Sequence, residues 1–201
     1  VLMTKNFPHK SFFFWGERGN NGKSTLIKML QNFADGLHTN VPLDKFEDDT
    51  SVYSMIGKLL NVADDIDASY LEKSSNFKTI ASGDPVMVRP IYSSAITFQN
   101  KSTLVFTCNE LPVFKDKSGG IKRRMQIIPC DAYVTKRDPD IDDKLSSDNA
   151  KSYILNLALA GVERILVNGG LSKSKTIDDV TKQYFVQSDS VLAFAEEHDI
   201  V

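Results

Sequence analysis

Residues Phe12–Leu30 read FFFWGERGNNGKSTLIKML, and this stretch decides what the rest of the chain is expected to form. Three phenylalanines and a tryptophan predict a buried strand, and a glycine-rich turn follows it directly. The apolar spacing after the turn predicts a helix. A strand, a glycine-rich loop and a helix in this order predict a phosphate-binding loop. Its glycines let backbone amides approach an anion, and the helix directs the positive end of its dipole at the same place.

The loop also contains the side chains that a nucleotide site needs. Lys23 would reach the β- and γ-phosphates, and the Ser24 hydroxyl would bind Mg²⁺, with Thr25 as the weaker alternative. The residues predicted to contact the nucleotide are Gly19, Asn20, Asn21, Gly22, Lys23, Ser24 and Thr25. The alternative is an ordinary strand-to-helix connection without a ligand.

The spacing of the loop departs from the usual pattern. That pattern has four residues between the first glycine and the Gly-Lys pair, whereas five separate Gly16 from Gly22. Either the loop is one residue longer than usual, or Glu17 occupies the place of the first glycine.

Composition limits the classes of protein that remain. A chain of 201 residues with 41% hydrophobic residues can bury a core, and its net charge of −2 gives no global signature of a nucleic-acid binder. Cys108 and Cys130 are too few for a disulfide framework or a zinc site. No run of about 18 apolar residues predicts a membrane span. We expect this chain to be a fragment of a longer protein.

Two further apolar runs end in polar residues that suit nucleotide chemistry. Leu59–Ala63 predicts a strand, and Asp64 and Asp65 follow it. One carboxylate would hold the Mg²⁺ shell and the other would orient or deprotonate the attacking water. Lys101–Cys108 predicts another buried strand, with Asn109 just past its end, where an amide can bind the water or the γ-phosphate. The alternatives are an acidic loop after the first strand and a cap or turn at Asn109.

The order of the predicted elements indicates the fold class. Strands that alternate with helices, with polar residues at the strand ends, favour an α/β protein with a parallel sheet flanked by helices, as in P-loop NTPases of the AAA+ type. Residues 1–135 are predicted to form this NTPase core, and 136–201 a C-terminal helical extension. The predicted helices include Lys23–Asp35, one capped by Thr50 or Ser51, Lys73–Ser82 and, in the extension, Ser152–Val167. The segment Ile177–His198 predicts one or two more helices, with a buried side made of Tyr184, Phe185, Val191, Leu192 and Phe194.

Between these parts the chain predicts a hairpin and an arginine pair. Val86–Arg89 and Ala95–Phe98 read as β-like runs on either side of a short turn. Arg123 and Arg124 come just before the apolar run Met125–Pro129. Two adjacent arginines there would stabilise charge on a transferring phosphoryl group, or they are solvated surface charge.

With these pieces in place, the sequence resembles the superfamily 3 helicase domain of phage and plasmid primase-helicases, which are related to the poxvirus nucleoside triphosphatase. The resemblance extends from the GNNGKST loop to at least IKRRMQIIP (121–129). Its most specific part is the order of three stretches: KTIASGDPVMVRPIY (78–92), TLVFTCNELP (103–112) and IKRRMQIIPCD (121–131).

The resemblance implies roles for individual residues. Lys23 and Ser24 match the phosphate and Mg²⁺ residues, and Asp65, with Asp64 beside it, matches the acidic residue of the second motif. Asn109 matches the sensor asparagine. Arg124, with Arg123 as the alternative, matches the arginine that a neighbouring subunit inserts into the ATP site. The segment 83–98 matches a DNA-contacting hairpin, so Lys78 and Arg89 become candidate DNA contacts, although the hairpin tip carries no basic residue.

The resemblance also implies an activity and partners. It implies an ATP- and Mg²⁺-dependent helicase motor that acts as a homo-hexameric ring on single-stranded or forked DNA. Further implications are a primase portion upstream and a place in the cytoplasm of a bacterium that carries the phage or prophage. An NTPase that remodels protein, and a nucleotide-binding DNA initiator or scaffold that does not hydrolyse ATP, are the alternatives. A small-molecule kinase is disfavoured because the sequence contains no recognisable acceptor-binding lid.

Overall fold

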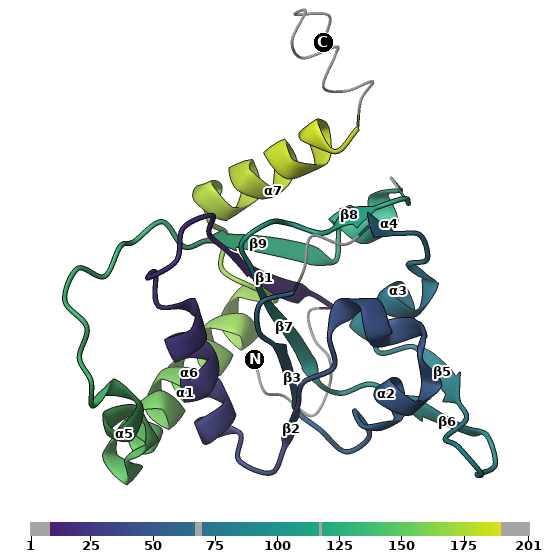
Figure 1. The fold of residues 1–201 in the computed structure, drawn as a ribbon, viewed down its shortest axis with the longest axis horizontal. Helices are drawn as coiled ribbons and strands as arrows, with labels where there is room; N and C mark the ends of the chain where they lie inside the picture. The colour runs from purple at the N-terminus through teal and green to yellow at the C-terminus, as the bar shows by residue number, and fades with distance from the viewer. Residues whose placement is uncertain (1–8, 67–69, 117, 190–201) are drawn as a thin grey trace, which may run out of the picture.

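Five parallel strands form the central sheet in the order β2-β3-β7-β1-β9 (Figure 1). The computed structural model describes residues 9–66, 70–116 and 118–189. In chain order the strands of this sheet are β1 Ser11–Trp15, β2 His38–Thr39, β3 Leu60–Ala63, β7 Thr103–Cys108 and β9 Met125–Pro129. The predicted fold class, a parallel α/β sheet flanked by helices, is confirmed.

Alternation along the strands gives the sheet two apolar faces. Phe13 of β1 and Phe106 of β7 stack with ring centroids 4.9 Å apart on one face. Leu60 and Val105 face the other side, where they pack with Ile27 of the first helix. Every residue of β7 is buried, as expected for a central strand covered on both faces. The sheet is therefore packed with apolar side chains on both faces, and different residues lie at the two ends of its strands.

Helices cover both faces of the sheet. In Figure 1, α1 (Lys23–Phe33), α5 (Ile141–Ser146) and α6 (Asp148–Asn168) lie on one side, and α2 (Asp49–Tyr53) and α3 (Ser75–Ser82) on the other. The short 3₁₀ helix η1, Leu43–Glu47, precedes α2.

The prediction of Thr50 or Ser51 as a helix cap is wrong. α2 starts at Asp49, and the carboxylate of Asp48 accepts a hydrogen bond from the Ser51 backbone N–H at 2.9 Å. A carboxylate accepts such a bond as readily as a hydroxyl, so the stretch offers several possible starts.

The predicted hairpin is present. Strands β5, Pro85–Val88, and β6, Ile96–Gln99, pair antiparallel and project from the body of the molecule (Figure 1). The Tyr92 side chain at the tip is fully exposed. Two smaller strands, β4 (Tyr70–Leu71) and β8 (Val113–Phe114), form a separate parallel pair, and α4 (Gly119–Lys122) leads into β9.

The C-terminal part contains the two longest helices. α7, Lys175–Gln187, packs on β9, where the Thr181 hydroxyl accepts a hydrogen bond from the Ile127 backbone N–H at 3.1 Å. Tyr184 and Phe185 pack against the core as predicted, whereas Val191, Leu192 and Phe194 lie outside the described residues.

The long helix α6 is much more exposed than a packed helix. The helix predicted at Ser152–Val167 is present, but only Ile165 of α6 is buried, and Leu155, Leu157 and Leu159 are each about half exposed. None of the described helices, α6 included, is both long and apolar enough to cross a bilayer.

Candidate nucleotide-binding site

The carboxyl ends of the central strands bring the predicted site residues to one edge of the sheet. Trp15 pairs with Cys108 on one side and Pro129 on the other, so the residues that follow these strands emerge together. A pocket of about 990 Å³ opens at this edge. It is lined by the loop Gly19–Thr25, by Asp64, Asp65, Thr107 and Asn109, and by side chains from α1, α5 and the connection 134–139.

Close packing at Gly16 fixes the start of the loop. A Cβ atom placed on Gly16 would lie 2.4 Å from the Asn21 amide nitrogen and 2.6 Å from the Cys130 carbonyl oxygen. Asn21 holds the loop closed here, because its side-chain amide donates to the backbone carbonyls of Arg18 at 2.8 Å and Cys130 at 3.1 Å. Gly16 is thus the residue that must be glycine, and Glu17 beside it is exposed. The loop from Gly16 is therefore one residue longer than the usual pattern.

The tip of the loop uses left-handed backbone conformations. Asn20 has a φ of 60° and Gly22 a φ of 83°, and the helix α1 starts directly after Gly22. Asparagine and glycine are the residues that tolerate this conformation best. The turn aims the first backbone amides of α1 and their dipole into the pocket.

Lys23 lies at the centre of the site and is 7% exposed. Its ammonium donates to the Gly16 carbonyl at 2.8 Å and to the Asn109 side-chain oxygen at 3.0 Å. A cation held this way sits where a bound triphosphate would bring its negative charge.

Asn109 and Thr107 tie the two aspartates to this lysine. The Asn109 amide group donates to the Asp65 carboxylate at 2.9 Å while its oxygen accepts from Lys23. The Thr107 hydroxyl donates to the Asp64 carboxylate and accepts from the Asp65 backbone N–H at 2.7 Å. Lys23, Asn109 and Asp65 form one continuous polar chain, with Asp64 fixed beside it.

Backbone geometry orients these groups further. Asp65 has a φ of 51°, a left-handed conformation that points the chain away from β3 immediately after the carboxylates. The Trp15 indole N–H donates to the Asn109 backbone carbonyl at 3.1 Å and holds the turn after β7. Strand ends, not flexible loops, position the polar chain.

The donor set suits Mg²⁺ bound together with a nucleotide. The Ser24 side chain is exposed in the pocket, and both aspartates are exposed on its opposite side. Among the described residues, no three His, Cys, Asp or Glu side chains gather as a metal site of their own. Mg²⁺ at NTPase sites typically uses one or two protein ligands and completes its shell with phosphate oxygens and waters.

Cys108 lies close to Lys23 but is unsuited to act as a nucleophile. Burial raises the pKa of the Cys108 thiol to about 12, although the nearby Lys23 ammonium opposes the shift. A thiol with this pKa stays protonated at neutral pH, and the thiolate is the reactive form. The chemistry of the pocket therefore depends on its oxygen and nitrogen groups.

The arginine pair lies at the opposite edge of the sheet. Arg124 precedes β9 at its amino end, and its carbonyl accepts from the Ser11 backbone N–H, so the structure does not bring it to the pocket of its own chain. Its guanidinium is buried and donates to the Ser82 hydroxyl at 2.8 and 2.5 Å and to the Gly120 carbonyl at 2.7 Å. Arg123 beside it is exposed. A role in a neighbouring subunit's site stays a prediction for both.

The two candidate DNA contacts differ in their surroundings. Lys78 lies on α3, not on the hairpin, and its half-buried ammonium pairs with the Asp116 carboxylate at 2.6 Å. Arg89 is exposed at the end of β5. The predicted DNA contacts stay predictions, and Arg89 is the better placed of the two.

Sequence reasoning missed the connection after β9 as part of the site. The Val134 backbone N–H donates to the Asn20 carbonyl at 2.7 Å, and the Arg137 guanidinium donates to the Asn20 side-chain oxygen. The connection therefore crosses the tip of the phosphate loop. Its charged residues, Lys136 and Arg137, were the available signal, but nothing local in the sequence shows that they return to the loop.

Comparisons with known proteins give a family and a fold. A family model described as "Family of unknown function (DUF5906)" matches residues 14–124. No curated protein matches the chain.

A solved structure described as the A form apo structure of the NrS-1 C terminal region is similar at 17% identity and a TM-score of 0.66, over 91% of this chain and 42% of that one. A second, described as the A form apo structure of the NrS-1 C terminal region (305–718), is similar at 14% identity and a TM-score of 0.63, over 94% of this chain and 44% of that one. The chain thus spans less than half the length of these structures, and at this identity the similarity shows the fold alone.

Proposed function

The chain belongs to DUF5906, a family of unknown function, and we propose that this chain is the ATP-hydrolysing motor domain of a DNA helicase. The observation that carries the ATPase proposal is the polar chain Lys23–Asn109–Asp65 beside the phosphate loop. In this chain of hydrogen bonds, the side-chain amide of Asn109 links the Lys23 ammonium, which would bind the phosphates, to the Asp65 carboxylate, which would act on the attacking water.

Each group has a distinct task in hydrolysis. The loop amides and Lys23 bind the β- and γ-phosphates and neutralise charge that develops on them. Asp65 orients or deprotonates water for in-line attack, and Asn109 holds that carboxylate at its distance from the lysine. Bound Mg²⁺, held by Ser24 with Asp64 or Asp65, would supply further charge neutralisation on the phosphate oxygens.

The helicase part of the proposal depends on the resemblance described above, on the hairpin and on the charge of the chain. The hairpin β5–β6 projects from the body with an exposed tip, as an element that contacts a strand of DNA would. With a net charge of −2 the chain has little affinity for DNA by charge alone, so several copies around one strand would have to combine weak contacts. A homo-hexameric ring meets this need.

The ring would also complete the ATP site. Arg123 and Arg124 lie at the edge of the sheet opposite the phosphate loop. In a head-to-tail ring, this edge of one protomer can meet the pocket of the next, which suits an arginine supplied by the neighbour. A primase portion upstream, and a bacterial cytoplasm as the place of action, are parts of the same proposal.

The test combines ATP hydrolysis with strand separation. The protein is assembled with ATP and Mg²⁺, and phosphate release is measured with and without oligo-dT, followed by unwinding of a fluorescent forked duplex. We expect hydrolysis that rises with single-stranded DNA and ATP-dependent opening of the fork. Hydrolysis without unwinding or DNA stimulation would favour a protein-remodelling NTPase. ATP-dependent assembly without hydrolysis would favour an initiator or scaffold.

A further inference from the structure

We propose that the connection 131–140 and α5 form the nucleobase subsite of the pocket, and that this subsite accepts purine and pyrimidine nucleoside triphosphates with little discrimination. The subsite rests on the proposed function, since it needs a triphosphate in the loop. It concerns a part of the chain that lies outside the residues 14–124 matched by the family model.

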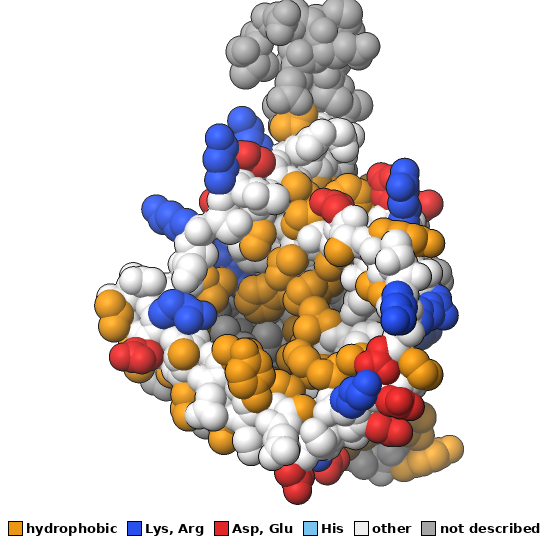
Figure 2. Space-filling view, turned by 90° about the vertical axis from the view of Figure 1, so that its left-hand side faces the viewer, with side chains coloured by type: hydrophobic (Ala, Val, Ile, Leu, Met, Phe, Trp, Pro, Cys, Tyr) orange, Lys and Arg blue, Asp and Glu red, His pale blue; other side chains and the backbone are white. Residues whose placement is uncertain are grey.

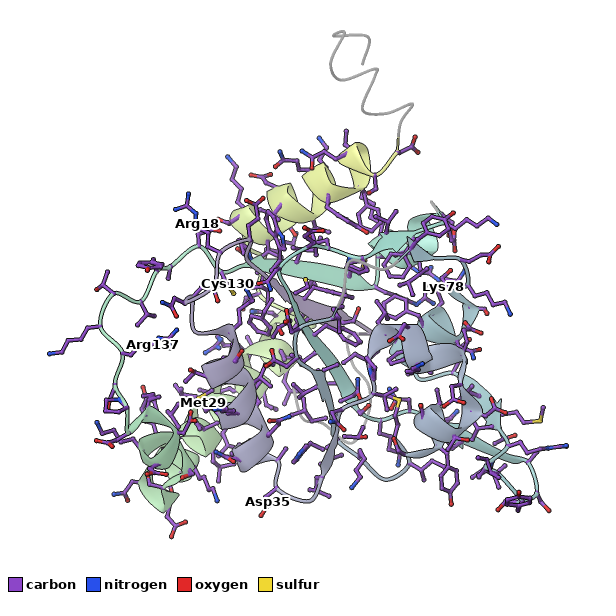
Figure 3. All side chains as sticks on the ribbon, viewed as in Figure 1. Arg18, Met29, Asp35, Lys78, Cys130 and Arg137 are labelled. Carbon is purple, nitrogen blue, oxygen red and sulfur yellow. The ribbon has the colours of Figure 1, made fainter. Side chains whose placement is uncertain are left out.

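The connection is fixed over the phosphate loop at two points. Val134 and Arg137 both contact Asn20, one through the backbone at 2.7 Å and the other through its guanidinium. Figure 3 shows Arg137 on this connection, with its side chain directed toward the loop before α1. A ligand whose phosphates occupy the loop must therefore extend beneath this connection.

One face of α1 continues the pocket away from the phosphates. Thr25 and Met29 are four residues apart, so they lie on the same face of the helix, and both line the pocket. Ile27 points the other way and is buried against the sheet. Met29 lies six residues beyond Lys23, about 9 Å along the helix at 1.5 Å per residue. This is on the scale of the separation between the phosphates and the base of a nucleotide.

The connection and α5 supply both apolar and charged side chains to the pocket, and the apolar ones suit contact with a base. Val134, Pro139, Ile141 and Leu145 line the same pocket from the connection and α5. An ion pair between Lys28 of α1 and Asp142 of α5, at 2.5 Å, holds α5 beside α1. In Figure 2, which looks onto the side where the connection and α5 lie, hydrophobic side chains gather around a hollow. Apolar walls on either side of a slot suit the flat faces of a base.

The two carboxylates of the connection and α5 that line the pocket, Asp138 and Asp142, are already paired. Asp142 is bound to Lys28, and Asp138 accepts from the Lys144 ammonium at 2.6 Å and from the Asp140 backbone N–H at 3.1 Å. Strong discrimination between bases comes from polar groups that pair with a base edge and are left unpaired by the wrong one. With both lining carboxylates engaged and Arg137 bound to Asn20, contact of apolar side chains with the base faces gives affinity with little selectivity.

The experiment compares nucleotides with a ligand that has phosphates and no base. Affinities for ATP, GTP, CTP and inorganic tripolyphosphate are measured by calorimetry with Mg²⁺. The variants are Met29→Ala/Leu145→Ala and, as a matched control, Leu155→Ala/Leu159→Ala on the exposed part of α6; thermal melting checks that both fold. We expect the three nucleotides to bind within about fivefold of one another. The pocket variant should lose about tenfold in ATP affinity, with tripolyphosphate unchanged, because truncated apolar contacts cost this much.

Three outcomes would overturn the subsite. The first is that the wild type binds ATP and tripolyphosphate with equal affinity, and the second is that the pocket variant loses equal affinity for both ligands. The third is that the wild type prefers one base over the others by more than about a hundredfold in affinity. The first two leave the phosphate loop in place, whereas failure of the wild type to bind either ligand would remove the proposed function itself. If the pocket variant does not fold, limited trypsin digestion of the wild type decides. ATP should slow cleavage after Lys136 and Arg137 and tripolyphosphate should not, and equal cleavage rates would reject the subsite.

Discussion

At the residue scale, Asn109 is the link between the cation and the carboxylate of the site. Its amide oxygen accepts from Lys23 at 3.0 Å and its amide nitrogen donates to Asp65 at 2.9 Å. No other side-chain type of this size offers one donor and one acceptor in this geometry. Asn109 thus sets the distance between the group that binds phosphate and the group that acts on water.

Replacement of Asn109 by alanine should therefore lower kcat while ATP affinity changes little. A pre-positioned hydrogen-bonding group that acts in the transition state contributes about a hundredfold or more to the rate. Steady-state phosphate release gives kcat, and calorimetry gives the affinity for a non-hydrolysable ATP analogue. An equal loss in both quantities would mean that Asn109 holds the loop together and does not act in the reaction.

Gly16 offers a second test at the residue scale. A Cβ at Gly16 would collide with the Asn21 amide and the Cys130 carbonyl, whereas a Cβ at Gly170, outside the pocket, meets nothing within 4 Å. We expect Gly16→Ala to weaken nucleotide binding at least about tenfold, because the loop must shift away from the Cys130 backbone. Gly170→Ala is the matched control and should bind ATP nearly as wild type does. Similar affinities for the two variants would contradict the packing argument.

The sequence indicated the residues of the site that follow a local rule. Lys23, Asp65 and Asn109 each come at a predictable place relative to a strand or helix end, and the structure brings them together. Thr107 was missed because its side chain acts on residues more than forty positions earlier. The Arg137–Asn20 contact joins residues 117 positions apart, and no local pattern predicts such a closure.

At the element scale, α3 connects the hairpin β5–β6 with Arg124. Ser82, the last residue of α3, accepts two hydrogen bonds from Arg124, and β5 of the hairpin starts three residues later at Pro85. Gly83 ends the helix in a left-handed conformation with a φ of 69°. The element order was predictable from periodicity, but the partner of Arg124 was not, because it depends on how α3 packs.

The ion pair between α3 and the segment before α4 should make stability depend on acidity. The hydrogen bond from Lys78, with those from Ser118, lowers the pKa of Asp116 below its ordinary value of 3.8. A carboxyl with a lowered folded-state pKa stabilises the fold above its ordinary pKa, and this contribution is lost as the pH falls below it. The melting-temperature difference between wild type and Asp116→Asn should thus be largest above about pH 4 and shrink in stronger acid.

Thermal melting of both proteins from pH 6 to pH 2 checks this expectation. Asp131→Asn, at an exposed position, is the control and should follow the wild type throughout. A melting-temperature difference for Asp116→Asn that stays constant across the range would show that the pair contributes packing and no linked charge.

At the scale of the whole molecule, the two edges of the sheet carry complementary halves of a proposed site. The phosphate loop and its carboxylates lie at the carboxyl edge, and Arg123 and Arg124 lie at the amino edge. One chain does not bring these halves together, so in the proposed site a neighbour would supply the arginine. A head-to-tail arrangement would achieve this at every interface of a ring.

Mixing two inactive variants tests that arrangement. Lys23→Ala removes the loop cation, and Arg123→Ala/Arg124→Ala removes both candidate arginines while leaving the loop intact. Each variant alone should hydrolyse ATP at a small fraction of the wild-type rate. An equal mixture should recover about a quarter of it, because that share of random interfaces joins an intact loop to an intact arginine. Activity that stays at the level of the separate variants would reject shared sites, provided that melting curves show both variants folded.

The most direct measurement for the whole account is phosphate release from ATP by wild type, Lys23→Ala and Lys101→Ala. Lys101 is an exposed lysine that precedes β7 at the opposite edge of the sheet, so it controls for loss of a charge. We expect Lys23→Ala to lose at least about a hundredfold in rate and Lys101→Ala to keep the wild-type rate. Wild-type hydrolysis by folded Lys23→Ala would contradict it, since the triphosphate would then react somewhere other than this pocket.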